Sequence, residues 1–464
     1  MHVPHFAPPP WVALFAIGCC ALGTAASTAA AATTVTPVRG EIRAVVFSGD
    51  AVVIARQPPG DGLKVERLLP GAPAQILVRK RLEDERDEVS LAGSAEALAV
   101  AVNAATEGFG SSRVLIGPPA GPLREVARCG AGVLVPPVAV AGSQIAWRDG
   151  GCARPARNPN AIGPATIAIA NVDPLLPARR ISVPGKGLPA SLVLAAGDTG
   201  LVGLLLAQPN DELSARIRPF APTAIGAPIA ARQSGYLLAL GILGDGTHVF
   251  AEIPSSKDCI FDVFAIAPAS GRPRVVAFGG CPDPTALPVV ATGVGPLGDR
   301  IVAIAAEPRR DTRRATTAIV SVRGDGGDRR VVARGTFRTP LGVAAEGDRV
   351  AWWQPRCAGG SEIVVRGAGE SEAAVISSCR AEIRSRSAQV RNGRIGVRVR
   401  CPHGCTGLAS VERIGAGTKR FSLAAGTHTL RLRVALGRRA RARVRVELEV
   451  DSGQTKSVRI SVRR

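Results

Sequence analysis

The stretch LGVAAEGDRVAWW, residues 341–353, joins two short apolar runs through a tight Gly-Asp turn. The same pattern occurs earlier in the chain as AVVFSGDAVVIA (44–55), VSLAGSAEALAVAV (89–102), VAVAGSQIAW (138–147), LVLAAGDTGLVGLLL (192–206), LLALGILGDGTHVFAEI (237–253) and GVGPLGDRIVAIAA (293–306). Two apolar runs around a glycine turn predict a β-hairpin. No long segment has the 3.6-residue apolar period of a helix, so we predict an all-β protein.

The hairpins recur with a regular spacing of about 50 residues, which is the period of a β-propeller blade. Their anchor glycines are Gly49, Gly93, Gly142, Gly197, Gly244, Gly298 and Gly347. Each interval has room for two more strands, such as SEIVVRG and EAAVISS after the last hairpin. We therefore predict a seven-bladed β-propeller over residues 33–379. The alternative is a pair of β-sandwiches with similar hairpins.

Trp352 and Trp353 pose a separate question, because the chain is only 3% aromatic. Adjacent tryptophans could form a platform for a stacked ligand. However, Trp352 follows its anchor glycine by the same interval as Trp147 in VAVAGSQIAW. We expect both tryptophans to pack inside a blade.

The GDRVAW turn and strand, followed by SEIVVRG, resemble the TolB-type and WD40-like propeller repeats of exported bacterial proteins. The resemblance covers about residues 40–379, and its motifs are degenerate, since the Gly-His and Trp-Asp signatures are missing. It implies a propeller fold and no particular activity.

The last part of the chain, residues 380–464, is strongly basic. It holds 21 Arg and Lys residues against 5 Asp and Glu, a net charge of +16 out of +21 for the whole chain. The runs RIGVRVRC (394–401), TLRLRVAL (429–436), RARVRVELEV (441–450) and KSVRISVRR (456–464) alternate between apolar and polar residues. Such alternation predicts half-buried strands, with these side chains inward: Ile395, Val397, Val399, Leu430, Leu432, Val444, Val446 and Val458.

We predict that these strands form a small antiparallel sandwich. The segments VRCPHGCTG (399–407) and FSLAAGTHTLRLRVAL (421–436) resemble the small immunoglobulin-like (Ig-like) modules of exported proteins from high-GC bacteria. That resemblance implies no catalytic residues. The arginines on the polar side are candidates for binding a polyanion: Arg398, Arg400, Arg431, Arg433, Arg443, Arg445 and Arg459. The alternative is a solvated face whose arginines reflect the codon bias of a GC-rich genome, since the chain has far more Arg than Lys.

Residues 1–32 have the features of a secretory signal, an apolar run WVALFAIGCCALG (11–23) followed by small residues. The chain would then be secreted or associated with the cell surface. A lipid attached at Cys19 is the alternative, and it is the one route to a membrane that the sequence offers.

Eight cysteines follow this segment, and an even number in an exported chain predicts disulfides. They are Cys129, Cys152, Cys259, Cys281, Cys357, Cys379, Cys401 and Cys405. The first six form successive pairs of similar spacing and the last two form a CxxxC motif. Placed on the predicted blades, Cys259 with Cys281 and Cys357 with Cys379 would close within a blade, and Cys129 with Cys152 would join two blades.

Candidate chemistry is sparse. Cys401, His403 and Cys405 could ligate a metal, but zinc needs a fourth ligand, so we expect a local disulfide. We expect His248 to be an exposed turn residue and the acidic run Glu83–Glu88 to be a solvated loop. We find no motif of a nucleophilic, nucleotide-binding or zinc enzyme and expect no cofactor.

These observations predict a secreted, disulfide-stabilised, non-enzymatic binding scaffold that is a monomer. Its partner would be an unidentified protein or an anionic polymer of the cell surface. One alternative is a propeller hydrolase or lyase that acts on an extracellular polysaccharide through carboxylates, with the C-terminal module as its anchor. A further alternative is polyanion adhesion through that module alone.

Overall fold

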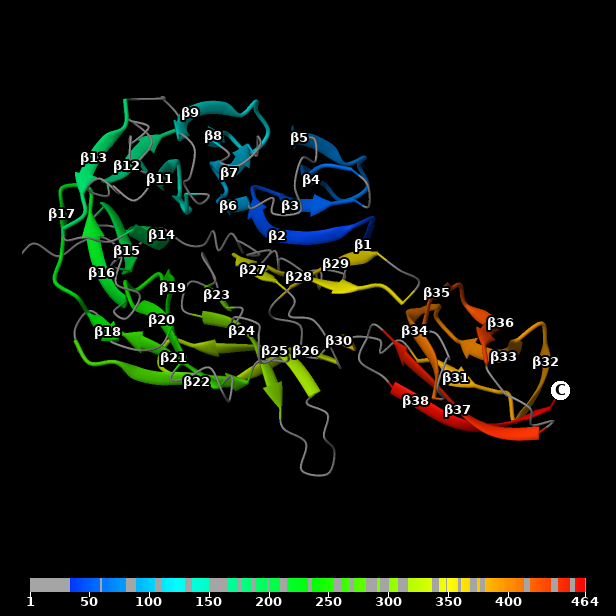
Figure 1. Ribbon diagram of the computed structural model, residues 1–464. Coiled ribbons are helices and arrows are strands. Elements are labelled where there is room, and N and C mark those ends of the chain that lie inside the picture. Colours follow the sequence, from blue (N-terminus) through cyan, green and yellow to red (C-terminus); the bar gives the residue numbers. More distant parts are fainter. Residues whose placement is uncertain are drawn as a thin grey trace, which may run out of the picture.

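The protein was analysed as a computed structural model, in which the described residues form strands and turns and no helix (Figure 1). The structure describes residues 34–463 with these gaps: 59–60, 81–88, 105–110, 130–135, 150–165, 173–176, 185–187, 198–199, 209–214, 233–235, 254–259, 268–270, 281–289, 293–299, 308–315, 336–341, 348, 358–359, 368–373, 376–379, 413–417, 435–440 and 451–454. The predicted signal segment and the acidic run lie outside the described residues.

Seven antiparallel sheets form the predicted seven-bladed β-propeller. The first blade contains β2 (Glu41–Ser48), β3 (Ala51–Gln57), β4 (Lys64–Leu68) and β5 (Gln75–Arg79). The second contains β6 (Val89–Gly93), β7 (Leu98–Ala104), β8 (Ser111–Gly117) and β9 (Arg124–Cys129). The third contains β10 (Val138–Ala141), β11 (Gln144–Arg148), β12 (Thr166–Asn171) and β13 (Arg179–Ser182). In every blade except the sixth, whose turn lies outside the described residues, the predicted anchor glycine lies between the first two strands or at the end of the first.

The fourth blade contains β14 (Leu188–Gly197), β15 (Gly200–Gln208) and β16 (Ala215–Ala221), with β17 (Ala224–Ile225) and β18 (Ala230–Arg232) both on the outer side of β16. The fifth contains β19 (Tyr236–Ile242), β20 (His248–Ile253), β21 (Ile260–Ile266) and β22 (Arg274–Gly280). The sixth contains β23 (Val290–Thr292), β24 (Arg300–Glu307), β25 (Thr316–Arg323) and β26 (Arg330–Gly335). The first strands of successive blades contact one another, and β27 of the last blade contacts β2 of the first.

The seventh blade is completed by the first strand of the chain. It contains β27 (Val343–Glu346), β28 (Arg349–Pro355), β29 (Ser361–Gly367) and, outermost, β1 (Thr34–Val38), which pairs antiparallel with β29. The prediction that EAAVISS forms this fourth strand is wrong. Its described part, β30 (Ala374–Val375), pairs with β26 of the sixth blade instead. The pairing of β1 with β29 joins the first strand of the chain to the last blade and so links the two ends of the propeller. The outer edge of β29 is thereby paired.

Hydrogen bonds between hairpin turns connect neighbouring blades. The Gly49 amide donates to the Ser94 carbonyl (2.9 Å), and the Ser94 hydroxyl donates to the Gly142 carbonyl (2.6 Å). Gly49 and Gly142 have φ angles of 59° and 56°, in the left-handed region where glycine carries no steric penalty. The turns that the sequence pattern identified therefore also hold the blades together.

The tryptophan pair packs inside the seventh blade, as predicted. Trp352 is 1% exposed, as is Trp147 at the equivalent position of the third blade. The Trp353 ring is half-buried and covers Gly342, since a Cβ built on that glycine would lie 1.3 Å from the ring. Trp353 packs against hydrophobic clusters on both sides of its strand. A stacking platform for a ligand is thereby ruled out.

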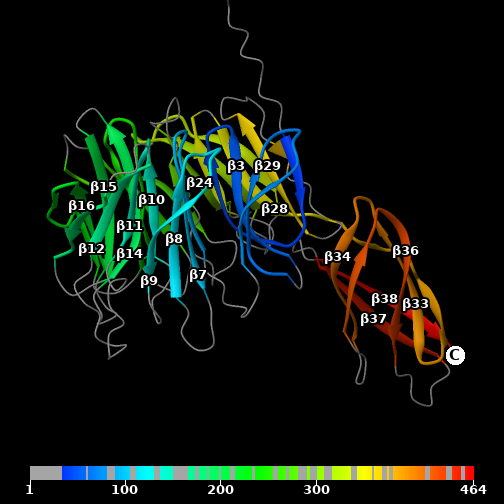
Figure 2. The same ribbon diagram turned by 90° about the horizontal axis from the view of Figure 1, so that it is seen from above.

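The C-terminal strands lie beside the propeller (Figure 2). They fold around a hydrophobic core of their own, to which Cys357 also contributes. They are β31 (Glu382–Ile383), β32 (Ser387–Arg391), β33 (Arg394–Cys401), β34 (Cys405–Glu412), β35 (Lys419–Leu423), β36 (Gly426–Arg433), β37 (Arg441–Val450) and β38 (Thr455–Arg463). β31, β33 and β36 pair in one layer, and β38, β37, β34 and β35 pair in the other; β32 pairs with β33 and β38 and so connects the layers. We call residues 380–464 the basic module.

No helix long and apolar enough to cross a membrane occurs in the part of the chain that the structure describes.

Candidate functional site

The basic module presents its arginines on the solvent side of its strands. Side chains alternate between the faces of a strand, and in β33 every second residue is buried while the residues between are exposed. The predicted inward residues are buried, apart from Val458, which is half-buried. All seven candidate arginines are exposed: Arg398, Arg400, Arg431, Arg433, Arg443, Arg445 and Arg459.

These arginines do not share one surface. β33 and β36 lie in one layer and β37 and β38 in the other, and both layers turn their apolar residues toward the same core. Their polar residues must therefore point in opposite directions. The β33–β36 face carries Arg398, Arg400, Arg431 and Arg433, whereas the β37–β38 face carries Arg443, Arg445 and Arg459. The expectation of a single arginine-covered sheet is thus corrected to two arginine faces.

Arg394 was missed as a candidate, although it has the same alternation as Arg398 and Arg400, and Arg441 and Arg463 were missed in the same way on the β37–β38 face. Arg394 lies on β33 directly opposite Arg433 of β36. Its exposed side chain adds a fifth arginine to the β33–β36 face. The two-residue period would have identified it, since it begins the RIGVRVRC run.

The two faces differ in their acidic residues. On the β33–β36 face the acid within reach is Glu382 of β31, which lies 4.0 Å from Arg400 and also contacts Arg384. Arg394, Arg398, Arg431 and Arg433 have no acidic partner within 4.0 Å among the described residues. The β37–β38 face contains Glu447 on β37 itself, and the neighbouring β34 supplies Glu412, which lies 3.5 Å from Arg445. The β33–β36 face therefore has the larger unbalanced positive charge.

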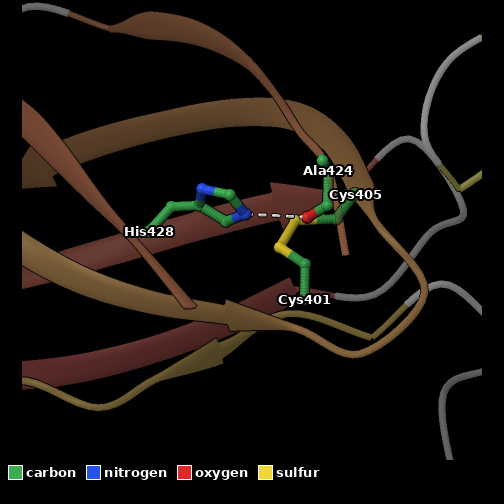
Figure 3. The surroundings of a disulfide bond; sticks show 4 residues. All are labelled: Cys401, Cys405, Ala424 and His428. Atoms are coloured by element: carbon green, nitrogen blue, oxygen red, sulfur yellow. Dashed lines mark hydrogen bonds between the residues drawn. A yellow bond between two sulfur atoms is a disulfide. The ribbon is translucent and has the colours of Figure 1, made fainter. Parts of the chain in front are cut away.

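The CPHGC segment contains the predicted disulfide. Cys401 and Cys405 are fully buried and bonded, with 5.6 Å between their Cα atoms (Figure 3). His428 lies nearby, and its Nε2 donates to the Ala424 carbonyl (2.9 Å), which fixes the protonated nitrogen because a carbonyl only accepts. Disulfide sulfurs do not ligate zinc as thiolates do. The metal alternative at this segment is therefore excluded.

The remaining disulfide predictions fall largely outside the described residues. Cys357 is buried and disulfide-bonded, and it contributes to the same hydrophobic cluster as the core of the basic module. Cys129 ends β9, but its side chain and the four other cysteines, Cys152, Cys259, Cys281 and Cys379, are not among the side chains described.

The propeller has a cavity of about 500 Å³ between the outer strands of its third and fourth blades. It is lined by Arg179, Arg180, Ile181, Ser182, Pro184, Pro222, Thr223, Ala224 and Ile225. Arg180 is held by Asp149, with 2.5 Å between Nε and the carboxylate oxygen. The lining contains no carboxylate or histidine that could exchange a proton with a substrate.

One other polar candidate, His248, has an ordinary structural role. His248 is the first residue of β20 and is half-buried, not exposed as expected, and burial lowers the pKa of its imidazole. Its side chain is therefore neutral at pH 7. In the part of the chain that is described, no group of three or more His, Cys, Asp or Glu side chains could hold a metal ion.

One carboxyl in the propeller has a perturbed environment. Glu346 ends β27, beside the turn of the first blade. Burial raises the pKa of this carboxyl, Arg349 at 3.4 Å lowers it, and the charge of Asp50 raises it further, so that the pKa lies above the ordinary value. A carboxyl with a raised pKa keeps its proton to a higher pH than an ordinary glutamate, as a general acid must. The sequence had no signal for it, because burial depends on how the last blade meets the first.

No protein-family model matches the sequence, and no curated protein is similar to it. Solved structures with a similar fold include a prolyl endopeptidase (11% identity, TM-score 0.47, covering 80% of this chain and 53% of that one). A puromycin-hydrolyzing peptidase of Mycobacterium tuberculosis is 11% identical (TM-score 0.43, 78% of this chain and 57% of that one). An oligogalacturonate lyase in complex with manganese is 11% identical (TM-score 0.46, 73% of this chain and 91% of that one).

The chain spans little more than half the length of these peptidases. At this identity the likeness concerns the propeller fold and transfers no reaction. It does correct one prediction. We predicted a non-enzymatic scaffold because enzyme motifs were missing, but the matched propellers belong to hydrolases and a lyase, so missing motifs in a propeller do not support that prediction, and it is withdrawn. The family to which the chain belongs is not established by these comparisons.

Proposed function

We propose that this chain binds an acidic polysaccharide through its basic module and thereby brings its propeller to that polymer. The observation that supports this proposal is the exposure of seven arginines in fixed rows on the strands of the module. Strands hold these charges in a rigid array, so less side-chain freedom is lost on binding than at a flexible basic tail. The planar guanidinium also matches the geometry of carboxylate and sulfate groups.

The composition of the module favours a polysaccharide over a nucleic acid. Its one aromatic residue other than histidine, Phe421, is 5% exposed and belongs to the core. Proteins that bind single-stranded nucleic acid without sequence preference stack bases on exposed aromatic side chains. The described outer faces of this module offer charge and hydroxyl groups without such a platform.

Polymer retention tests the proposal. We expect the purified chain to bind immobilised polygalacturonate and heparin at low salt and to elute as salt rises, because screening weakens contacts between exposed charges. Replacing all seven candidate arginines by glutamine should abolish retention at physiological salt.

A matched variant removes the same charge from the propeller, by glutamine at Arg39, Arg43, Arg124, Arg179, Arg216, Arg274 and Arg329. This variant should elute close to the unmodified chain. Equal losses in the two variants would show that net charge alone governs retention and would contradict the proposal, as would failure of the unmodified chain to bind.

Glu346 supports a second candidate function, cleavage of the bound polymer by the propeller. A buried carboxyl with a raised pKa is the side chain that such chemistry needs as a proton donor. Oligogalacturonate lyase is named for an acidic saccharide, which makes polygalacturonate the first polymer to test. We expect the chain to release new chain ends from polygalacturonate and the Glu346→Gln variant to release none. Equal release by both would exclude Glu346 as the proton donor.

The TolB-type assignment of the propeller, the Ig-like assignment of the module and export from the cell remain proposals. They are compatible with a polysaccharide partner at the cell surface.

A further inference from the structure

The β33–β36 face has a bare position at the centre of its arginines. Gly396 is exposed in the middle of β33, with Arg394 and Arg398 two residues away on the same face. Arg431 lies directly opposite on β36, and Arg433 is diagonal to the glycine because it pairs with Arg394. Residues two apart in a strand are separated by about 6.7 Å, and facing Cβ atoms by about 5 Å. Four arginine positions therefore neighbour one residue without a side chain.

Both features of this arrangement are unfavourable for the module alone. Glycine in a strand interior loses backbone entropy and has no side chain to pack, and it often marks a place where a ligand comes close to the backbone. Arg394 lies directly opposite Arg433, and like charges directly opposite each other destabilise a sheet. Neither arginine has an acidic partner within 4.0 Å among the described residues. A bound anion would relieve the repulsion and fill the space.

The glycine is not required by the fold of the strand itself. A Cβ built on Gly396 would meet a single side-chain atom, Cγ2 of Thr429, at 3.1 Å. No backbone atom lies within 4 Å of it, unlike at Gly407 of β34, where a Cβ would lie 2.1 Å from the Glu449 carbonyl. Packing therefore explains Gly407 and leaves Gly396 unexplained.

The opposite face provides the comparison. At the centre of the β37–β38 face, Ser461 occupies the position that Gly396 has on its own face, with Arg459 and Arg463 on the same strand and Arg443 opposite. Directly opposed arginines occur on this face as well, in the pairs Arg441–Arg463 and Arg445–Arg459. The difference between the faces is that a side chain fills this centre, whereas the centre of the β33–β36 face is bare. Nearby, Arg445 is engaged by Glu412.

We propose that the β33–β36 face is the binding face of the module, and that one carboxylate or sulfate group of the polysaccharide sits over Gly396. Arg394, Arg398, Arg431 and Arg433 hold the group, and the missing side chain lets the sugar ring approach the backbone. This inference rests on the proposed function, since it names the face and the position that the polymer uses.

A substitution that keeps every charge tests the anion-binding position over Gly396, which we call the seat. Gly396→Thr places a neutral side chain among the four arginines, and threonine is favourable in strands. We expect the affinity for polygalacturonate and for heparin to fall about tenfold, equivalent to about 1.4 kcal/mol. The control is Ser461→Thr, which gives the centre of the other face the same threonine by adding one methyl group and should alter affinity less than twofold. Thermal unfolding of each full-length variant establishes that it is folded.

A second pair of variants tests the face with equal charge loss. Arg431→Gln should weaken binding of both polymers at least fivefold, and Arg443→Gln less than twofold. Equal effects of these two variants, or no effect of Gly396→Thr in a folded chain, would overturn the inference and leave the proposed function intact. Absence of binding by the unmodified chain would instead end the proposed function. Loss of heparin binding alone would assign the seat to sulfate, and loss of polygalacturonate binding alone would assign it to carboxylate, and each outcome supports the seat.

Discussion

Arg349 of the seventh blade donates to the carbonyl of Gly49 in the first blade, with 2.8 Å between Nη2 and the oxygen, although the two residues are 300 positions apart. The same guanidinium donates to the Asp50 carbonyl at 3.3 Å and lies over the Phe47 ring, 4.6 Å from its centroid. The Gly49 amide at the same time donates to the second blade. One turn therefore joins three blades where the propeller closes.

The side chain of Arg349 should stabilise this closure. In Arg349→Gln the two hydrogen bonds to carbonyls and the cation–π contact are lost, and we expect the free energy of unfolding to fall by about 1–2 kcal/mol. Urea unfolding measures the difference. Arg356→Gln, an exposed change in the same blade, should stay within about 0.5 kcal/mol of the unmodified chain. Equal midpoints for the two variants would mean that Arg349 does not stabilise the closure.

Strand β1 offers its own matched pair of positions. Val38 is 7% exposed in a cluster with residues of the first and seventh blades, whereas Val35 of the same strand is 52% exposed. Val38→Ala removes buried apolar surface and should cost about 2 kcal/mol, while Val35→Ala should cost less than about 0.5 kcal/mol. Denaturant unfolding of both variants tests the pairing of β1 with the seventh blade. Similar stability of the two would argue that β1 does not dock there.

The Cys401–Cys405 bond should stabilise the basic module. In the chain-entropy account a loop of this length is worth about 2 kcal/mol. We therefore expect the double variant Cys401→Ser, Cys405→Ser to unfold at lower denaturant concentration under non-reducing conditions, with the module unfolding first. Peptide mapping of the unmodified chain should recover the two cysteines in one linked fragment. A pair of free thiols at these positions would contradict the bond.

Glu346 should make stability depend on pH. Burial raises its folded-state pKa above that of the unfolded chain, so the folded state holds the proton more tightly. The stabilisation is complete below about pH 4.3, the ordinary glutamate pKa, and is lost as the pH rises through the folded-state pKa. The free energy of unfolding of the unmodified chain, minus that of Glu346→Gln, should thus be larger at pH 4 than at pH 7. Glu41→Gln, at an exposed carboxyl, is the control, and a difference that is constant with pH would refute the raised pKa.

Much of the fold follows from local sequence patterns. The alternation in RIGVRVRC and RARVRVELEV predicted β33 and β37 with their bounds, because the two-residue period of a strand is written directly into apolar and polar residues. The repeated glycine turns likewise predicted the inner hairpins of the blades. Trp352 was assigned to a blade core by comparison with Trp147, since equivalent positions of a repeat have equivalent surroundings.

The partner of the last blade could not be found in the same way. EAAVISS has the composition of a fourth strand, but β1 occupies that place. Which segment pairs with the edge of β29 depends on ring closure, which brings the two ends of the propeller together. A local pattern contains no information about a partner more than 300 residues away.

Local sequence patterns establish that this protein is built of strands, how often its hairpins repeat, and that its arginines alternate with core residues. Three further features emerge only from the folded chain: β1 closes the propeller, the arginines of the basic module divide between two opposite faces, and Gly396 lies at the centre of one of them. The reason is that the period of a strand assigns each side chain to one side of its own sheet. The pairing of strands and the packing of layers then decide which side chains of different strands meet.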